Sequence, residues 1–225
     1  MTCIVGLKTD EAIYIGGDGR VSRGWSGIDR DGAVKVFERD GIVYGASGSM
    51  RGAQVIQHAL VTPRYHPDDD LLGYVAIQLT RAMRKVLKDN DAMRTDSDGE
   101  DFMGVWCAVA CEGRLFEVGA WGEVFEPAHG EVALGSGKDL ALGSLESTRS
   151  SDLSPEQRIM HAIVAAERHN SGVGDSITVA VVPINGEQGE MVLTTVEAEP
   201  EREEPEEEQP KASPKKAKGK KKEQG

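Results

Sequence analysis

The first 47 residues alternate between short apolar runs and turn signals, a pattern typical of antiparallel strands. Apolar runs at 3–7 and 12–15 predict one hairpin, and runs at 34–37 and 42–45 predict a second. The second pair flanks an Arg-Asp-Gly turn at 39–41, where glycine adopts a positive φ without steric cost. We therefore expect four strands at the start of the chain.

Helical periodicity follows these strands. We expect helices over roughly 50–60 and 70–87, because apolar residues in the second segment recur every three or four positions. The predicted buried stripe of the second helix consists of Leu72, Val75, Leu79, Met83 and Val86.

The second half of the chain repeats the same order. Glycine-punctuated strands are expected over 102–134, a helix pair comes next, and strands at 177–182 and 191–196 follow. One helix start is well marked, because the segment 154–157 reads Ser-Pro-Glu-Gln, with a capping serine, proline at the first helical position and glutamine at the third. Strands, helices, strands, helices and strands in this order predict an α+β fold with segregated helices. Two face-to-face sheets with a helix pair on each outer side form a four-layer αββα sandwich.

Charge and composition divide the chain into a body and a tail. The formal net charge is −12, and residues 197–225 hold nine Glu and eight Lys or Arg, so residues 1–196 carry −11. A body this acidic lacks the basic face that nucleic acid requires, so nucleic-acid binding is not expected. The tail is rich in proline and charge and almost devoid of apolar residues, which predicts one domain over 1–196 and a disordered charged tail over 197–225.

Four absent features further narrow the class of protein to which this sequence can belong. No apolar run reaches the roughly 18 residues of a membrane span and no secretory leader is recognisable, so we expect a cytoplasmic protein without membrane contact. The three cysteines lack zinc-ligand spacing and are expected to be reduced thiols. The GSGKD segment at 135–139 lacks the first glycine and the Ser or Thr of a phosphate-binding loop, and we expect no cofactor.

Two segments of the N-terminal half carry a family resemblance. MTCIVGLKTDEAIYIGGDGR and GAVKVFERDGIVYGASGS resemble the start of proteasome β subunits and bacterial HslV-type peptidases. The shared features are a Thr after the initiator Met, a Gly-Asp-Gly closing the second strand, a Lys opening the third and a glycine-rich segment closing the fourth. The resemblance continues more weakly across 1–184, including GSGKD at 135–139 and HNSGVGDSITV at 169–179. It implies the N-terminal nucleophile hydrolase fold.

The resemblance implies that Thr2 is the nucleophile once Met1 has been removed. A threonine hydroxyl needs an adjacent base, and an amino group on the same residue, with an ordinary pKa near 8, is suited to that role. Asp18 lies 16 residues after Thr2, the family's spacing, and Lys35 lies 33 residues after it, one more than usual. In the family the acid holds the lysine against the nucleophile, where a cation favours the alkoxide and keeps the amine less protonated. Taken singly, Asp18 also reads as a turn residue and Lys35 as a surface lysine.

The same resemblance assigns further residues to the site. Gly48 matches the glycine whose backbone N–H forms the oxyanion hole, while Ser136 and Ser171 match serines that support the amino terminus. One position departs from the family pattern, because Arg168 stands where the family has Asp three residues before the Ser-Gly pair. Asp175 could fill a related role from another position.

The resemblance also implies a substrate pocket near Val21, Ser47 and Met50, whose small or apolar side chains favour an apolar substrate residue. The leading hypothesis is therefore a threonine-type endopeptidase that forms an acyl-enzyme on Thr2. The resemblance alone implies that it acts on polypeptides within a homo-oligomeric ring, fed by an ATP-dependent unfoldase or cap. Two alternatives stay open: a small-molecule amidase of the same fold, and an inactive structural ring subunit, which the Arg168 departure suggests.

Overall fold

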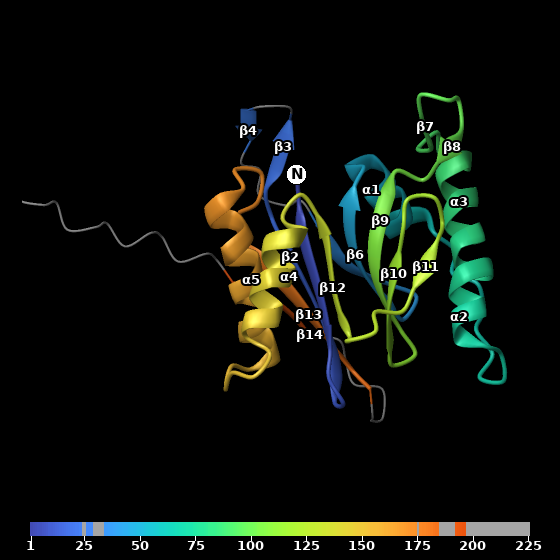
Figure 1. Cartoon of the computed structure of the whole chain (residues 1–225). Helices are drawn as coiled ribbons and strands as arrows, with labels where there is room; N and C mark the ends of the chain where they lie inside the picture. The colour runs from blue at the N-terminus through green and yellow to red at the C-terminus, as the bar shows by residue number, and fades with distance from the viewer. Residues whose placement is uncertain (24–25, 29–33, 175, 185–191, 197–225) are drawn as a thin grey trace, which may run out of the picture.

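The structure is a computed structural model that describes residues 1–23, 26–28, 34–174, 176–184 and 192–196 (Figure 1). The charged tail predicted at 197–225 lies outside the described residues. Within the described ranges, no helix combines the length and the apolar character needed to cross a bilayer.

The first sheet contains the strand that begins the chain. Its strand order is β12-β1-β2-β13-β14, and every neighbouring pair is antiparallel. Its strands are β1 (Cys3–Lys8), β2 (Ala12–Asp18), β12 (Glu131–Gly135), β13 (Ile177–Pro183) and β14 (Val192–Val196). The β1–β2 hairpin predicted from the sequence is confirmed, and β12 pairs with the other edge of β1, with Cys3 opposite Gly135. This pairing brings residues far apart in the chain to the start of β1.

The second sheet faces the first and has the order β11-β10-β9-β6-β5. Its strands are β5 (Val36–Arg39), β6 (Ile42–Gly48), β9 (Val105–Cys111), β10 (Arg114–Val118) and β11 (Val124–Phe125). The β5–β6 hairpin is confirmed. Two small pairs were not predicted, namely β3 (Val21–Arg23) with β4 (Ser26–Ile28), and β7 (Arg94–Thr95) with β8 (Asp101–Phe102).

The helices cover the outer faces of the two sheets (Figure 1). α4 (Lys138–Ser147) and α5 (Pro155–His169) pack on the first sheet, while α1 (Met50–Ala59) and the helix built from α2 (Leu71–Gly73), η1 (Tyr74–Leu79) and α3 (Thr80–Asp89) pack on the second. Separate apolar clusters fill the two helix-to-sheet layers and the layer between the sheets, where Ile4, Ile15 and Val43 meet. The predicted αββα sandwich is therefore confirmed.

The buried stripe predicted for the helix over 70–87 was wrong at its first residue. Leu72 is partly exposed, whereas its neighbour Leu71 is buried. Besides Tyr74 and Thr80, the buried side chains of this helix recur every four residues, at Leu71, Val75, Leu79, Met83 and Leu87. An α-helix has about 3.6 residues per turn, so a four-residue repeat would drift around it. The π-helical turn of η1 contains more residues per turn and brings the repeat back into phase with the sheet.

The predicted helix start at Ser154 is confirmed in detail. The Ser154 hydroxyl accepts the Gln157 N–H at 3.2 Å, and the Gln157 side chain accepts the Ser154 N–H at 2.9 Å, which completes a capping box before α5.

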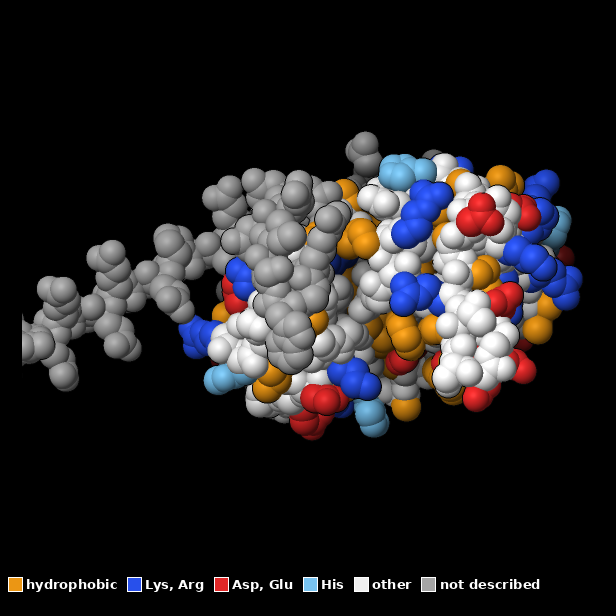
Figure 2. Space-filling model, turned by 90° about the horizontal axis from the view of Figure 1, so that it is seen from above, with side chains coloured by type: hydrophobic (Ala, Val, Ile, Leu, Met, Phe, Trp, Pro, Cys, Tyr) orange, Lys and Arg blue, Asp and Glu red, His pale blue; other side chains and the backbone are white. Residues whose placement is uncertain are grey.

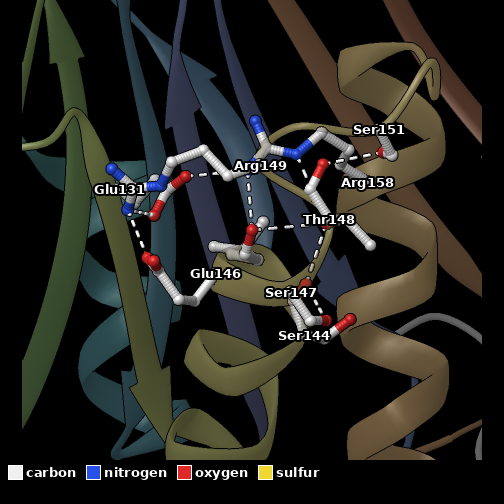
Figure 3. Close-up of polar contacts among 9 residues, drawn as sticks. Glu131, Ser144, Glu146, Ser147, Thr148, Arg149, Ser151 and Arg158 are labelled. Atoms are coloured by element: carbon white, nitrogen blue, oxygen red, sulfur yellow. Dashed lines mark hydrogen bonds and ion pairs between the residues drawn. The ribbon is translucent and has the colours of Figure 1, made fainter.

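An ion-pair network ties the α4–α5 hairpin to β12 (Figure 3). The Glu131 carboxylate accepts from Arg149 at 2.9 Å and from Arg158 at 2.8 Å. Arg158 also donates to the Leu145 carbonyl at 2.8 Å, and Arg149 also pairs with Glu146 at 2.6 Å. Only 9% of the Glu131 side chain is exposed, compared with 70% for Glu146. Glu131 therefore anchors both arginines from a nearly buried position.

We predict that Glu131→Gln lowers the free energy of unfolding by about 2 kcal/mol, because two arginines at a shielded site lose their shared charge partner. Glu146→Gln removes a solvent-exposed pair on the same arginine, and its effect should stay within about 0.5 kcal/mol. Urea denaturation of both variants measures the difference. Equal effects of the two substitutions would contradict this interpretation.

Candidate active site

A buried ion pair lies at the end of β2. The Lys35 ammonium donates to Asp18 Oδ1 at 2.9 Å, with 2% and 0% of the two side chains exposed. Lys35 also donates to the Arg20 carbonyl at 2.6 Å. Asp18 ends β2, and Lys35 immediately precedes β5, so the pair joins the two sheets. Burying two charges is unfavourable unless they are closely paired and hydrogen-bonded, as they are here.

The Asp18 carboxylate also positions the backbone around it. Oδ1 accepts the Cys3 N–H at 2.8 Å, and Oδ2 accepts the Gly174 N–H at 3.3 Å. The Lys35 ammonium and the Cys3 amide thus share one oxygen atom. Since Cys3 follows Thr2 directly, the shared oxygen places the ammonium beside the start of β1.

Thr2 is held on three sides and is only 7% exposed. Its N–H donates to Ser136 Oγ at 3.3 Å, and its carbonyl accepts the Gly137 N–H at 3.2 Å. Its hydroxyl donates to the Met1 carbonyl at 2.6 Å. Asn170 Nδ2 donates in turn to the Ser136 carbonyl at 2.9 Å, which fixes the segment that carries Ser136.

Gly135 explains how Thr2 and β12 can lie so close. Its φ is +89°, and a Cβ added there would lie 2.2 Å from the Thr2 carbonyl oxygen. Any larger residue would therefore be excluded by strain and by overlap. The same point lies 2.9 Å from Ser47 Oγ, so the buried Ser47 hydroxyl faces Thr2 from the second sheet.

Gly48 ends β6 with a φ of +96°. The N–H of Ser49 bonds to Gly104 on the β9 side, and the N–H of Ala46 bonds to Lys35 on the opposite side. Because successive N–H groups of a strand alternate in direction, the Gly48 N–H points away from β9, toward the end of the sheet where Lys35 lies. An N–H with this direction is suited to binding an oxygen atom near Thr2.

The residues on either side of Thr2 each carry an ionisable group with a shifted pKa. Burial and the nearby Lys35 ammonium lower the pKa of the Met1 amino group, while Asp18 opposes the shift. Burial, with Asp18 adding to it, raises the pKa of the Cys3 thiol to about 12. The Cys3 thiol therefore stays protonated and unreactive near neutral pH, and it packs beneath Gly137 in the apolar layer under α4 and α5.

Arg20 is a site residue that the sequence interpretation missed. Its Nη1 donates to the carbonyls of Ser171 and Val173 at 3.3 and 3.2 Å, while its own carbonyl accepts from Lys35. Arg20 therefore connects the 171–174 loop to the Lys35 and Asp18 pair. In the sequence, its position two residues after Asp18 is the feature that could have indicated a place in the site.

Figure 2 looks onto the end of the molecule where the N-terminus lies in Figure 1, and hydrophobic side chains are exposed on this face. Met1 is half exposed there, and its side chain covers Gly172, where an added Cβ would lie 2.2 Å from Met1 Cβ.

Comparison with known proteins agrees with this architecture. No protein-family model matches the sequence. The chain is 28% identical over 170 residues to the ATP-dependent protease subunit HslV of Roseobacter denitrificans, covering 73% of this chain and 84% of that protein. It is 29% identical over 195 residues to proteasome subunit beta 2 of Cenarchaeum symbiosum, covering 82% and 87%. The solved structure of Thiobacillus denitrificans BPH in complex with epoxomicin shares the fold, with a TM-score of 0.69 and 18% identity over 82% of this chain and all of that one.

The chain is therefore similar in sequence to HslV and proteasome β subunits, and it shares the fold of the BPH structure. Of the residues that the family resemblance singled out, Thr2 contacts Ser136 and Asp18 contacts Lys35, and the Cys3 amide, which follows Thr2, links the two pairs. Ser47 and Gly48 lie beside them on β6.

The remaining family positions are less directly connected. Ser171 contacts the group through its backbone carbonyl, which accepts from Arg20. Val21 follows Arg20 and is half-buried, and Met50 is the first residue of α1. Arg168, at the departure from the family pattern, is exposed on the last turn of α5, and Asp175 lies outside the described residues.

Proposed function

We propose that this chain is a threonine-type endopeptidase subunit whose nucleophile is Thr2, freed by cleavage of the Met1–Thr2 bond. The observation that carries the proposal is the buried Lys35 ammonium, which shares Asp18 Oδ1 with the amide that follows Thr2. If Lys35 were a surface lysine and Asp18 only a turn residue, neither side chain would need to be buried. The relatives named as an HslV protease subunit and a proteasome subunit support the same activity.

Cleavage after Met1 changes the chemistry of Thr2 in two ways. While Met1 is attached, the Thr2 nitrogen is an amide without basicity, and the Thr2 hydroxyl donates to the Met1 carbonyl. Cleavage converts the nitrogen into an amine and releases the hydroxyl from that bond. The new amine would form beside the position of the Met1 amino group, whose pKa burial and the Lys35 charge both lower, and the same causes would leave more of it unprotonated.

The reaction then follows from the positions of these groups. The Thr2 amine takes the hydroxyl proton as Oγ1 attacks the scissile carbonyl carbon, and the Lys35 ammonium stabilises the developing alkoxide. The Gly48 N–H binds the resulting oxyanion. Collapse of the tetrahedral intermediate breaks the C–N bond, and the leaving amine takes up the proton. The acyl group stays on Oγ1 until water, deprotonated by the Thr2 amine, hydrolyses the ester.

The assembly and the substrate are parts of the same proposal. HslV is named as a subunit of an ATP-dependent protease, and we propose that this chain likewise forms a cytoplasmic ring through residues 1–196 and receives polypeptides from an ATP-dependent unfoldase. The retained Lys35 and Asp18 pair favours an active subunit over an inactive one. Cleavage of a protein such as casein, rather than of small amides alone, would separate the peptidase from an amidase of the same fold.

Covalent labelling tests the proposal directly. We expect incubation of the native protein with epoxomicin, the ligand of the BPH structure, to give one adduct per active chain. Peptide mapping by mass spectrometry should place the adduct on Thr2 of chains that lack Met1, and heat-denatured protein should give none. Chains that keep Met1, or an adduct on another residue, would refute the assignment of Thr2.

A further inference from the structure

Trp106 is an exposed aromatic residue at the start of β9 beside the candidate oxyanion glycine. It pairs with Ser47 across the β6–β9 ladder, and it is 39% exposed, although the rest of β9 from Cys107 to Cys111 is buried. Side chains alternate along a strand, and Val105 packs against Gly52 of α1. Trp106 therefore points to the opposite face, the face that Ser47 shares.

The indole ring lies directly against Gly48. A Cβ added to Gly48 would lie 3.0 and 3.1 Å from two ring carbons of Trp106. Ser47, the cross-strand partner of Trp106, has its hydroxyl beside Gly135 and the Thr2 carbonyl. The indole, Gly48, Ser47 and Thr2 thus lie along one edge of the layer between the sheets.

The second exposed tryptophan of the described chain provides a contrast. Trp121 is 48% exposed, but its ring stacks on Phe102 with the centroids 4.9 Å apart. No aromatic ring stacks on Trp106 within the residues that the structure describes. A half-exposed indole without a ring partner retains a large apolar face, which can stack on another apolar or aromatic group.

We propose that Trp106 contacts the substrate side chain next to the scissile carbonyl and favours large apolar or aromatic residues there. This inference rests on the proposed function, because the indole lies against the glycine whose N–H would bind the oxyanion, and a substrate residue held at that glycine comes within reach of the ring. Trp106 then acts as a specificity residue. It takes no part in the proton transfers at Thr2.

Kinetics on paired peptides test the inference. With fluorogenic peptides that differ only in Phe or Ala before the scissile bond, we expect Trp106→Ala to lower kcat/KM for the Phe peptide about tenfold, mainly through KM. The Ala peptide should change less than about twofold, and Trp106→Phe should recover most of the loss because it keeps an aromatic face. Trp121→Ala is the matched control and should leave the ratio of the two peptides unchanged.

Labelling of the same variants by epoxomicin separates the two proposals. Normal labelling of Thr2 with an unchanged Phe-to-Ala ratio in Trp106→Ala would overturn the role of Trp106 alone. An equal loss for both peptides would also overturn it, because it would show a structural role at Gly48. A change in sedimentation coefficient would place Trp106 at an interface between copies and likewise contradict the inference. Absence of Thr2 labelling in the unmodified protein would refute the proposed function itself.

Discussion

Replacing Thr2 by alanine is expected to abolish peptide hydrolysis, with a loss in kcat of at least about 10³-fold. The substitution removes the hydroxyl that attacks the carbonyl, and the neighbouring Cys3 thiol cannot replace it, because its raised pKa keeps it protonated. Alanine is also small, so cleavage after Met1 should continue, and the variant should differ from the native protein in the nucleophile alone. Steady-state kinetics together with intact-protein mass measure both points.

Thr2→Ser is the matched control for this experiment. It keeps a hydroxyl on the first residue of the processed chain and loses only a methyl group from a position that is 7% exposed. Its kcat should stay within roughly tenfold of the native value, since the same amine and the same lysine act on the hydroxyl. Activity of Thr2→Ala comparable with that of Thr2→Ser would mean that the hydrolysis depends on another residue.

Replacing Asp18 by alanine is expected to cost about 3–5 kcal/mol of unfolding free energy, because it leaves the buried Lys35 ammonium without its carboxylate. The Cys3 and Gly174 amides lose their acceptor at the same time. Hydrolysis should fall as well, because Asp18 positions Lys35 beside Thr2. Urea denaturation and peptide kinetics on the same preparation measure the two losses.

Two controls separate stability from catalysis. Asp89→Ala breaks the exposed ion pair between Lys85 and Asp89 on α3, and it should change stability by no more than about 0.5 kcal/mol. In the double variant Asp18→Ala with Lys35→Met, both buried charges are absent, so much of the stability should return while the activity stays lost. A double variant that regains activity would show that the lysine has no part in the chemistry.

Local patterns in the sequence determined much of the fold. The Arg-Asp-Gly turn at 39–41 and the capping box at Ser154 depend on neighbouring residues only, and both formed as predicted. The alternation of strand and helix segments was enough to predict the four layers. The family resemblance singled out Thr2, Asp18 and Lys35, and in the structure one Asp18 oxygen accepts from Lys35 and from the amide that follows Thr2.

Only the tertiary structure decided which side chains are buried and which backbone groups meet. Lys35 is buried because Asp18 reaches it from the opposite sheet, and the Arg20 side chain reaches a loop about 150 positions later in the chain. Leu71 replaces Leu72 in the core because η1 changes the phase of the helix, and Trp106 reaches Gly48 through the β6–β9 register. Each of these results depends on contacts between distant segments. Local propensity and periodicity do not record such contacts, because they describe only the neighbours of a residue along the chain.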